Sequence, residues 1–175
     1  MGTRQPTRNP RPAVAPPPPP GLAGEIHKSG PFASPAQEAY LNLVRTFAVL
    51  SQDFDRLFRR HGLSGSTYNL LRILRGSGDT GRTCGEIRDH MVWRVPDVTR
   101  LADNLVRRGL ASRVRGEGDK RTVRLFITPK GLRVLARLDK TVLDLHEAQL
   151  GHMPSADLAS LSGLLHAARK PDPET

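Results

Sequence analysis

The feature that most constrains the fold is a change of apolar periodicity within residues 94–133. At first the apolar side chains recur at steps of three and four, as in a helix with one apolar face. After Gly109 the spacing becomes two, over residues 110–114 and 122–128, which is typical of two strands joined by a tight turn. The sequence therefore predicts a helix followed directly by a β-hairpin. The helical positions are Val98, Leu101, Ala102, Leu105 and Val106.

The ends of this helix are marked by residues with strong conformational preferences. Val95-Pro96 is expected to start it, because proline lacks the N–H group that the first turn leaves unpaired. Asp97 then complements the positive end of the helix dipole. Gly109 is expected to end it, because glycine readily takes the left-handed conformation that follows many helices.

Charge is concentrated in the same stretch. Residues 94–133 contain 11 Lys or Arg and 4 Asp or Glu, a net charge of +7, whereas residues 35–93 and 134–175 together contain 12 of each kind. A neutral body with one basic segment is typical of a polyanion-binding protein, because each cation set on a phosphate releases condensed counterions. The total formal charge of +10 makes nucleic acid the first partner to consider and an anionic membrane surface the second.

Helical periodicity covers most of the remaining chain. A short predicted helix, a turn and the longer helix at 95–108 form a helix-turn-helix, whose second helix enters the major groove of DNA. The fold class is therefore mainly α with a small β-hairpin wing, a winged helix-turn-helix. The other helices are expected over residues 35–62, from after Ser64 to Gly76, over residues 85–92, from Pro129 and from about Ser155.

The first 34 residues differ in composition from the rest. They contain a run of five prolines, Pro16 to Pro20, and few large apolar side chains. Such a segment buries too little apolar surface to offset its ordering entropy, so residues 1–34 are expected to be disordered or polyproline II. Their arginines leave two roles open, a solvated tail and a basic arm that contacts phosphates. One folded domain is expected over residues 35–170, followed by a tail at 171–175.

Several classes of protein are disfavoured by what the sequence lacks. The six histidines have no zinc-ligand spacing, and Cys84 is the single cysteine, so no metal site or intrachain disulfide is expected. No glycine-rich phosphate loop or nucleophile motif is present, so neither an enzyme nor a cofactor is expected. No apolar run has the roughly 18 to 20 residues that span a membrane, and no secretory signal is found. A cytoplasmic, nucleoid-associated protein is expected.

The exposed side of the helix at 95–108 carries candidate DNA contacts. Thr99, Arg100 and Asn104 are side chains that hydrogen-bond to base edges. Arg94, Arg107 and Arg108, at the two ends, are suited to phosphates. The simpler interpretation of the same residues is an ordinary solvated helix.

The hairpin tip carries a second set of candidates. Asp119 and Arg121 lie two residues apart in an extended strand, so the carboxylate reaches the guanidinium and holds it in one rotamer. An arginine held in this way suits the narrow, electronegative minor groove. Lys120 between them is a further candidate DNA contact. The simpler interpretation is a surface ion pair worth about 0–1 kcal/mol.

Four short segments follow one another along the chain: VPDVTRL at 95–101, RRGL at 107–110, the D-x-R of Asp119 and Arg121, and TPKG at 128–131. In order and spacing they resemble the multiple antibiotic resistance regulator (MarR) family of bacterial winged-helix transcription factors, and the resemblance covers about Pro35 to Arg169. The resemblance implies the order helix, helix, strand, helix, helix, strand, strand, helix, helix. It also implies that Arg121 enters the minor groove, that Asp119 orients it, and that Thr99 and Arg100 read bases.

The resemblance further implies a homodimer. The dimerisation helices would lie at 35–62 and 132–170, and the DNA-binding lobe between them at 64–131. Wide apolar stripes at both ends of the chain independently require a partner surface. The predicted function is a sequence-specific regulator, expected to be a repressor, that binds a pseudo-palindromic operator in double-stranded DNA. Family members are often released by a small aromatic anion or by cysteine oxidation.

Two other functions fit the composition, an architectural protein that binds DNA by charge alone and an adaptor that uses its proline-rich segment. Asp97, Asp103 and Asp119 favour the regulator, because carboxylates near DNA reduce affinity and make sense as orienters or as filters against wrong sequences. The effector is not identified by the sequence. Cys84 lies away from the family's reactive position and is most simply a small buried side chain.

Overall fold

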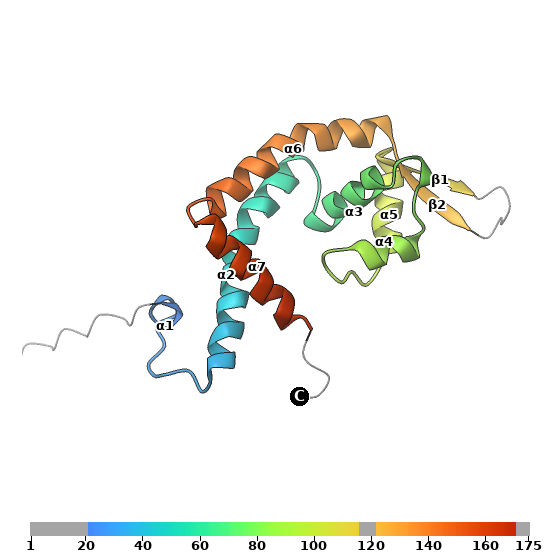
Figure 1. Ribbon diagram of the computed structural model, residues 1–175. Helices are drawn as coiled ribbons and strands as arrows, with labels where there is room; N and C mark the ends of the chain where they lie inside the picture. The colour runs from blue at the N-terminus through green and yellow to red at the C-terminus, as the bar shows by residue number, and fades with distance from the viewer. Residues whose placement is uncertain (1–20, 116–121, 171–175) are drawn as a thin grey trace, which may run out of the picture. The chain divides into compact units, whose positions relative to one another are not determined.

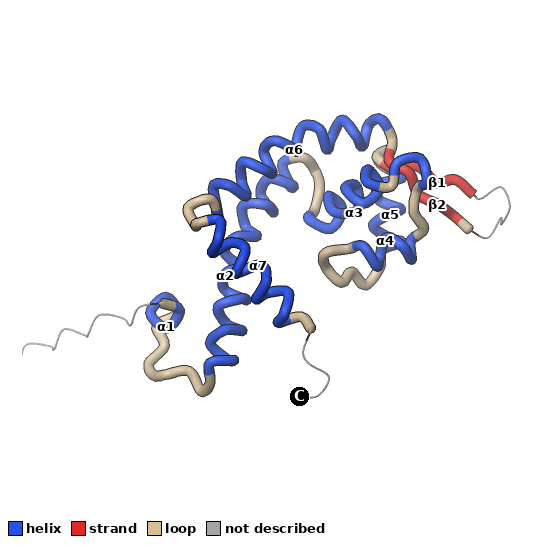
Figure 2. Tube along the Cα trace, viewed as in Figure 1, coloured by secondary structure: helices blue, strands red, loops and turns tan. Residues whose placement is uncertain are grey.

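The computed structural model of the chain describes residues 21–115 and 122–170. The contacts divide the chain into two compact units, residues 1–49 and 50–175, and the division falls inside helix α2. The described residues are mostly helical with one antiparallel hairpin, as the sequence predicts (Figure 1, Figure 2). The elements are α1 (Leu22–Glu25), α2 (Pro35–Arg60), α3 (Gly65–Gly76), the 3-10 turn η1 (Gly78–Thr80), α4 (Cys84–His90), α5 (Val98–Arg107), β1 (Ala111–Arg115), β2 (Val123–Ile127), α6 (Pro129–Leu150) and α7 (Ser155–Ala168).

The first unit contains α1 and most of α2. The prediction of disorder over residues 1–34 is not tested for residues 1–20, which lie outside the described part of the chain. Residues 21–34, however, include the single turn of α1, in which Leu22 is buried. Glu25 of this turn lies 3.4 Å from Nε of Arg45 in α2, and both side chains are about half exposed.

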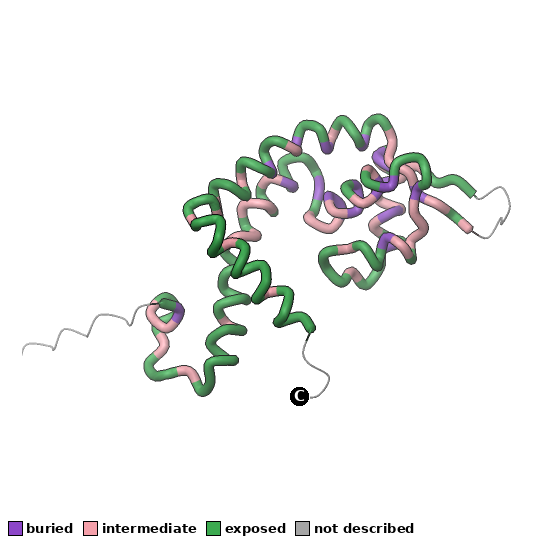
Figure 3. Tube along the Cα trace, viewed as in Figure 1, coloured by how far each residue is buried: buried purple, intermediate pink, exposed green. Residues whose placement is uncertain are grey.

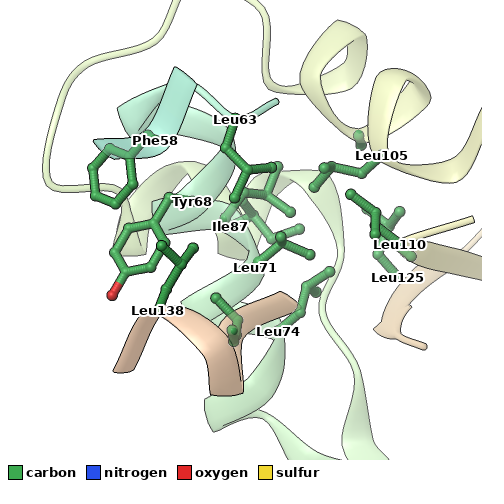
Figure 4. Packing of buried hydrophobic residues seen from close by; sticks show 14 of the residues in the cluster. Phe58, Leu63, Tyr68, Leu71, Leu74, Ile87, Leu105, Leu110, Leu125 and Leu138 are labelled. Atoms are coloured by element: carbon green, nitrogen blue, oxygen red, sulfur yellow. The ribbon is translucent and has the colours of Figure 1, made fainter. Parts of the chain in front are cut away.

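The second unit is built around one apolar core, to which α3, α4 and α5 all contribute (Figure 4). Phe58, near the end of α2, stacks on Tyr68 of α3 with 4.4 Å between ring centroids. Burial of each large side chain stabilises the fold by about 1.5–3 kcal/mol. The fully buried side chains are Leu70, Leu71, Leu74, Ile87, Leu105, Leu125, Leu135 and Leu138.

Caps explain where the helices begin. Ser64 and Thr67 form a capping box at the start of α3, and Thr83 and Glu86 form another at the start of α4. Such reciprocal bonds satisfy backbone N–H groups that the first turn leaves without partners. Thr128 caps α6 by accepting the N–H of Gly131 at 3.1 Å. These side chains are close in sequence to the helices they start, so the predicted starts of α3 and α6 agree with the structure. The predicted start of α7 at Ser155 also agrees, although no side chain caps it.

The strand expected between the second and third predicted helices is reduced to a single pair of residues. Arg82 and Leu125 exchange two backbone hydrogen bonds, of 2.9 and 2.7 Å. Gly81 turns the chain with a φ of 59°, and Thr83 is already committed to capping α4. Only one residue is therefore left to pair with β2. The observed element order accordingly differs from the family order at this strand and at the added turn α1.

Candidate nucleic-acid interface

Helix α5 is held by a buried face and an external cap. Val98, Ala102 and Leu105 are buried, as the periodicity predicts, and Gly109 follows the helix with a φ of 68°. The predicted start at Val95-Pro96 is wrong, because the helix begins at Val98. Asp97 is its N-cap, and its Oδ1 accepts the backbone N–H of Arg100 at 2.8 Å. A side-chain acceptor at this position fixes the first turn more strongly than the proline before it.

Helix α4 is shorter than predicted. The expected helix over residues 85–92 instead runs from Cys84 to His90, and Met91 has extended backbone. The N–H of Val92 donates to Oδ1 of Asn69 in α3 at 2.9 Å. This bond takes the chain away from the helix axis, so Val92 is exposed and the turn to α5 begins. Helices α4 and α5 nevertheless have the predicted helix-turn-helix order.

The candidate residues on α5 fall on two sides of the helix. Arg100, Asn104 and Arg107 line one hollow of about 590 Å³, together with the turn before α3 and the segment 95–97. Thr99 lines a second hollow of about 520 Å³, between the start of α4, α5 and the hairpin. Arg94 is exposed on the loop before α5 and lines neither hollow. The structure therefore separates Thr99 from the row of Arg100, Asn104 and Arg107.

The hairpin follows α5 directly in the chain, as predicted. Its register pairs Ala111 with Ile127 and Arg115 with Val123. Asp119, Lys120 and Arg121 lie outside the described residues, so their roles remain predictions.

Each hairpin strand is also tied to one helix of the helix-turn-helix. On β1, Nη1 of Arg113 lies 2.6 Å from Oδ1 of Asp103 in α5. On β2, Arg124 donates from Nε to the carbonyl of Thr80 at 2.8 Å and lies 3.4 Å from Glu86 of α4. Neither the two ion pairs nor the hydrogen bond to Thr80 was predicted from the sequence. The available signal was the single carboxylate, Asp103, on the polar side of α5.

Glu86 stays charged at this junction. The backbone N–H of Thr83 lowers its pKa most, and burial raises it by less than this. The side chain of Thr83 and the guanidinium groups of Arg124 and Arg82 lower the pKa further. A charged Glu86 serves both the capping box of α4 and the tether to β2. The position of the hairpin is therefore coupled to the start of α4.

Other kinds of site find little support in the described residues. Within residues 21–115 and 122–170, no group of three or more His, Cys, Asp or Glu side chains is arranged to hold a metal ion. In the same part of the chain, no helix is long and apolar enough to cross a lipid bilayer. Cys84 is partly buried at the start of α4 and lines the hollow that contains Thr99.

Comparison with known proteins places this geometry among transcription factors. The model of the MarR family matches residues 61–122. No curated protein matches the chain. A MarR transcription factor from Planctomyces limnophilus is 38% identical, and the match covers 78% of this chain and 98% of that one, with a TM-score of 0.60.

Two more distant structures share the fold. Sco3205, a MarR family transcriptional regulator from Streptomyces coelicolor in complex with DNA, is 19% identical over 85% of this chain and 96% of its own, with a TM-score of 0.71. BpsR from Bordetella bronchiseptica, whose DNA binding is regulated by 6-hydroxynicotinic acid, is 19% identical over 82% of this chain and 100% of its own, with a TM-score of 0.70.

Proposed function

We propose that this chain, which belongs to the MarR family of transcriptional regulators, binds a specific sequence in double-stranded DNA as a homodimer and represses transcription. The observation that carries the proposal is the row of Arg100, Asn104 and Arg107 on a helix whose opposite face is buried. A helix supported in this way enters the major groove as a rigid element. Thr99 and Arg94 add contacts on either side of this row.

DNA binding at fixed salt is the first test. The operator is recovered by sequencing the genomic fragments that the protein retains, and binding is then measured by fluorescence anisotropy. The proposal expects the operator to bind at least about a thousandfold more tightly than random DNA. Affinity is also expected to fall steeply with salt, because phosphate contacts release counterions. An operator no better than random DNA would contradict the proposal.

Arg100→Ala tests the reading helix. Operator binding is expected to weaken by about 1–3 kcal/mol, as for other arginines that contact bases. Arg137→Ala is the matched control, because Arg137 is exposed on α6 and removes the same charge from another surface. Equal effects of the two substitutions would reject a reading role for Arg100.

The wing tip is proposed as a minor-groove contact from the family resemblance. Arg121 would enter the groove, Asp119 would orient it, and Lys120 would contact the backbone. Arg121→Ala is expected to weaken operator binding by about 1–3 kcal/mol while leaving the dimer intact. Unchanged affinity at fixed salt would reject this assignment.

Exposed apolar side chains support the homodimer. In the first unit, Tyr40, Val44 and Phe47 of α2 are about half exposed or more, and in the second unit Leu161 and Leu164 of α7 are exposed. Figure 3 colours most of α2 and of α7 as exposed. Apolar surface of this kind is typical of an interface. Two protomers would set their reading helices about 34 Å apart, one turn of DNA. Sedimentation equilibrium is expected to give a dimer, and Leu164→Glu to shift it toward monomer.

Repression and release by a small aromatic anion are proposed by likeness to the family. Deleting the gene is expected to raise transcription beside the recovered sites, and lower transcription would indicate an activator. An aromatic acid that acts as effector is expected to reduce operator binding in the anisotropy assay.

An architectural role is the second candidate, and the charge of +7 over residues 94–133 favours it. Such a protein would bind all DNA with similar affinity. The ratio of operator to random affinity therefore separates the two functions.

A further inference from the structure

The polar side of α5 carries one acidic residue, and that residue is paired with the hairpin. An oxygen of Asp103 lies 2.6 Å from Nη1 of Arg113, and the two side chains are 46% and 34% exposed. A carboxylate and a guanidinium at this separation form an ion pair. The pair therefore joins the reading helix to the wing at the surface, where both groups remain close to any DNA that the helix contacts.

The surroundings of the pair show what the carboxylate opposes. Asp103 follows Thr99 by four residues, so both lie on the same side of α5. Thr99 lines a hollow together with Arg113 and Arg115. Without Asp103 this hollow would present two guanidinium groups to a DNA phosphate. With it, the charge of Arg113 is compensated inside the protein.

The pair affects DNA binding in two opposite ways. A compensated Arg113 releases fewer counterions on contact with a phosphate, and this loss applies to any DNA sequence. The same pair holds β1 against α5, and a fixed wing helps only a complex in which base contacts need one orientation. The pair therefore weakens binding to random DNA through the compensated charge, and the fixed wing gives random DNA nothing in return. Binding to the operator is weakened by the same charge effect, but the fixed wing restores part of that affinity.

We propose that Asp103 is a specificity-determining residue, which acts by holding Arg113 against α5 and so weakens binding to random DNA more than binding to the operator. The proposal rests on the proposed function, because it assumes that the outward side of α5 faces DNA. It assigns Asp103 a role in rejecting wrong sequences and Arg113 a role in positioning the wing.

Asp103→Asn tests the charge effect in the full-length protein. Random-DNA affinity is expected to rise several-fold, and the slope of log affinity against log salt to steepen by about 0.9 for the one cation released. Operator affinity is expected to rise less or to fall, so the ratio of operator to random affinity decreases. Asp144→Asn is the matched control, because Asp144 pairs with Lys140 on α6 and its loss changes the net charge equally. The control is expected to leave unchanged both the salt dependence of binding and the ratio of operator to random-DNA affinity.

Arg113→Gln completes the test, because it leaves Asp103 uncompensated beside DNA. Random-DNA affinity is expected to fall several-fold, in the opposite direction to Asp103→Asn, while the ratio again decreases. If the pair were purely structural, both substitutions would change random-DNA affinity in the same direction. The inference is overturned when wild type prefers its operator but Asp103→Asn keeps the wild-type slope and ratio. A wild type without operator preference would instead reject the proposed function itself.

Discussion

Replacement of Gly131 by alanine is expected to destabilise the protein, although alanine is the better helix former. Gly131 is buried in the first turn of α6. A Cβ atom there would overlap the carbonyl oxygen of Leu110 and lie 2.8 Å from Cγ1 of Ile127. Neither neighbour is free to retreat. The carbonyl of Leu110 accepts the N–H of Thr128 at 3.1 Å, and Ile127 is paired with β1.

Two opposing effects set the magnitude. In an unhindered helix, alanine in place of glycine raises the free energy of unfolding by up to about 1 kcal/mol. Overpacking of a tight site lowers it by about 1–3 kcal/mol. Movement of α6 away from the hairpin also stretches the Thr128–Leu110 hydrogen bond, which is worth about 1 kcal/mol. The overlap therefore outweighs the helix propensity, and a net loss of about 1–3 kcal/mol is expected.

Urea unfolding followed by far-UV circular dichroism measures this loss, at equal protein concentrations so that any association is matched. Gly76→Ala is the matched control, because its Cβ would meet nothing within 4 Å at the end of α3. The control is expected to be unchanged or more stable by up to about 1 kcal/mol. A Gly131→Ala protein at least as stable as wild type would refute the reasoning, since the junction would then accommodate a methyl group without cost.

Two further substitutions test the core and an ion pair. Leu105→Ala empties a fully buried position under α5 and is expected to lower the free energy of unfolding by about 2–5 kcal/mol in the same titration. Asp139→Asn removes the double hydrogen bond from Arg75, at 2.7 and 2.9 Å, and is expected to cost up to about 1 kcal/mol at neutral pH because both side chains are partly exposed. Arg75, with a smaller contribution from Arg72, lowers the pKa of Asp139. The stabilisation is therefore complete above the unfolded pKa and lost as the pH falls through the folded one, so the difference in stability between the two proteins should begin to shrink below about pH 4 and vanish only below the folded pKa.

The helix-turn-helix and the hairpin are predictable because their signals are local. The apolar face of α5 follows from residue spacing, and Gly109 follows from the conformation it must take. The error at the start of α5 shows where local signals compete. Pro96 and Asp97 are both typical of a first turn, and the choice between them depends on whether the Asp97 carboxylate reaches the N–H of Arg100.

The candidate site was predicted only in part. Spacing along α5 identifies its polar residues, but not the separation of Thr99 from Arg100, Asn104 and Arg107. That separation depends on two neighbours, the turn before α3 and the hairpin. The turn before α3 is distant in sequence, and the hairpin, although it directly follows α5, folds back beside Thr99, so periodicity along α5 carries no information about the separation.

By itself the sequence determined the fold class, the order from α4 through α5 to the hairpin, and the residues that α5 turns outward. Each of these depends on spacing and on caps within a few residues. Only the tertiary structure decided that Asp103 holds Arg113, that Arg75 holds Asp139 across 64 residues, and that Gly131 touches Leu110. Each of these contacts joins two different parts of the fold, so it depends on how the helices and the hairpin pack.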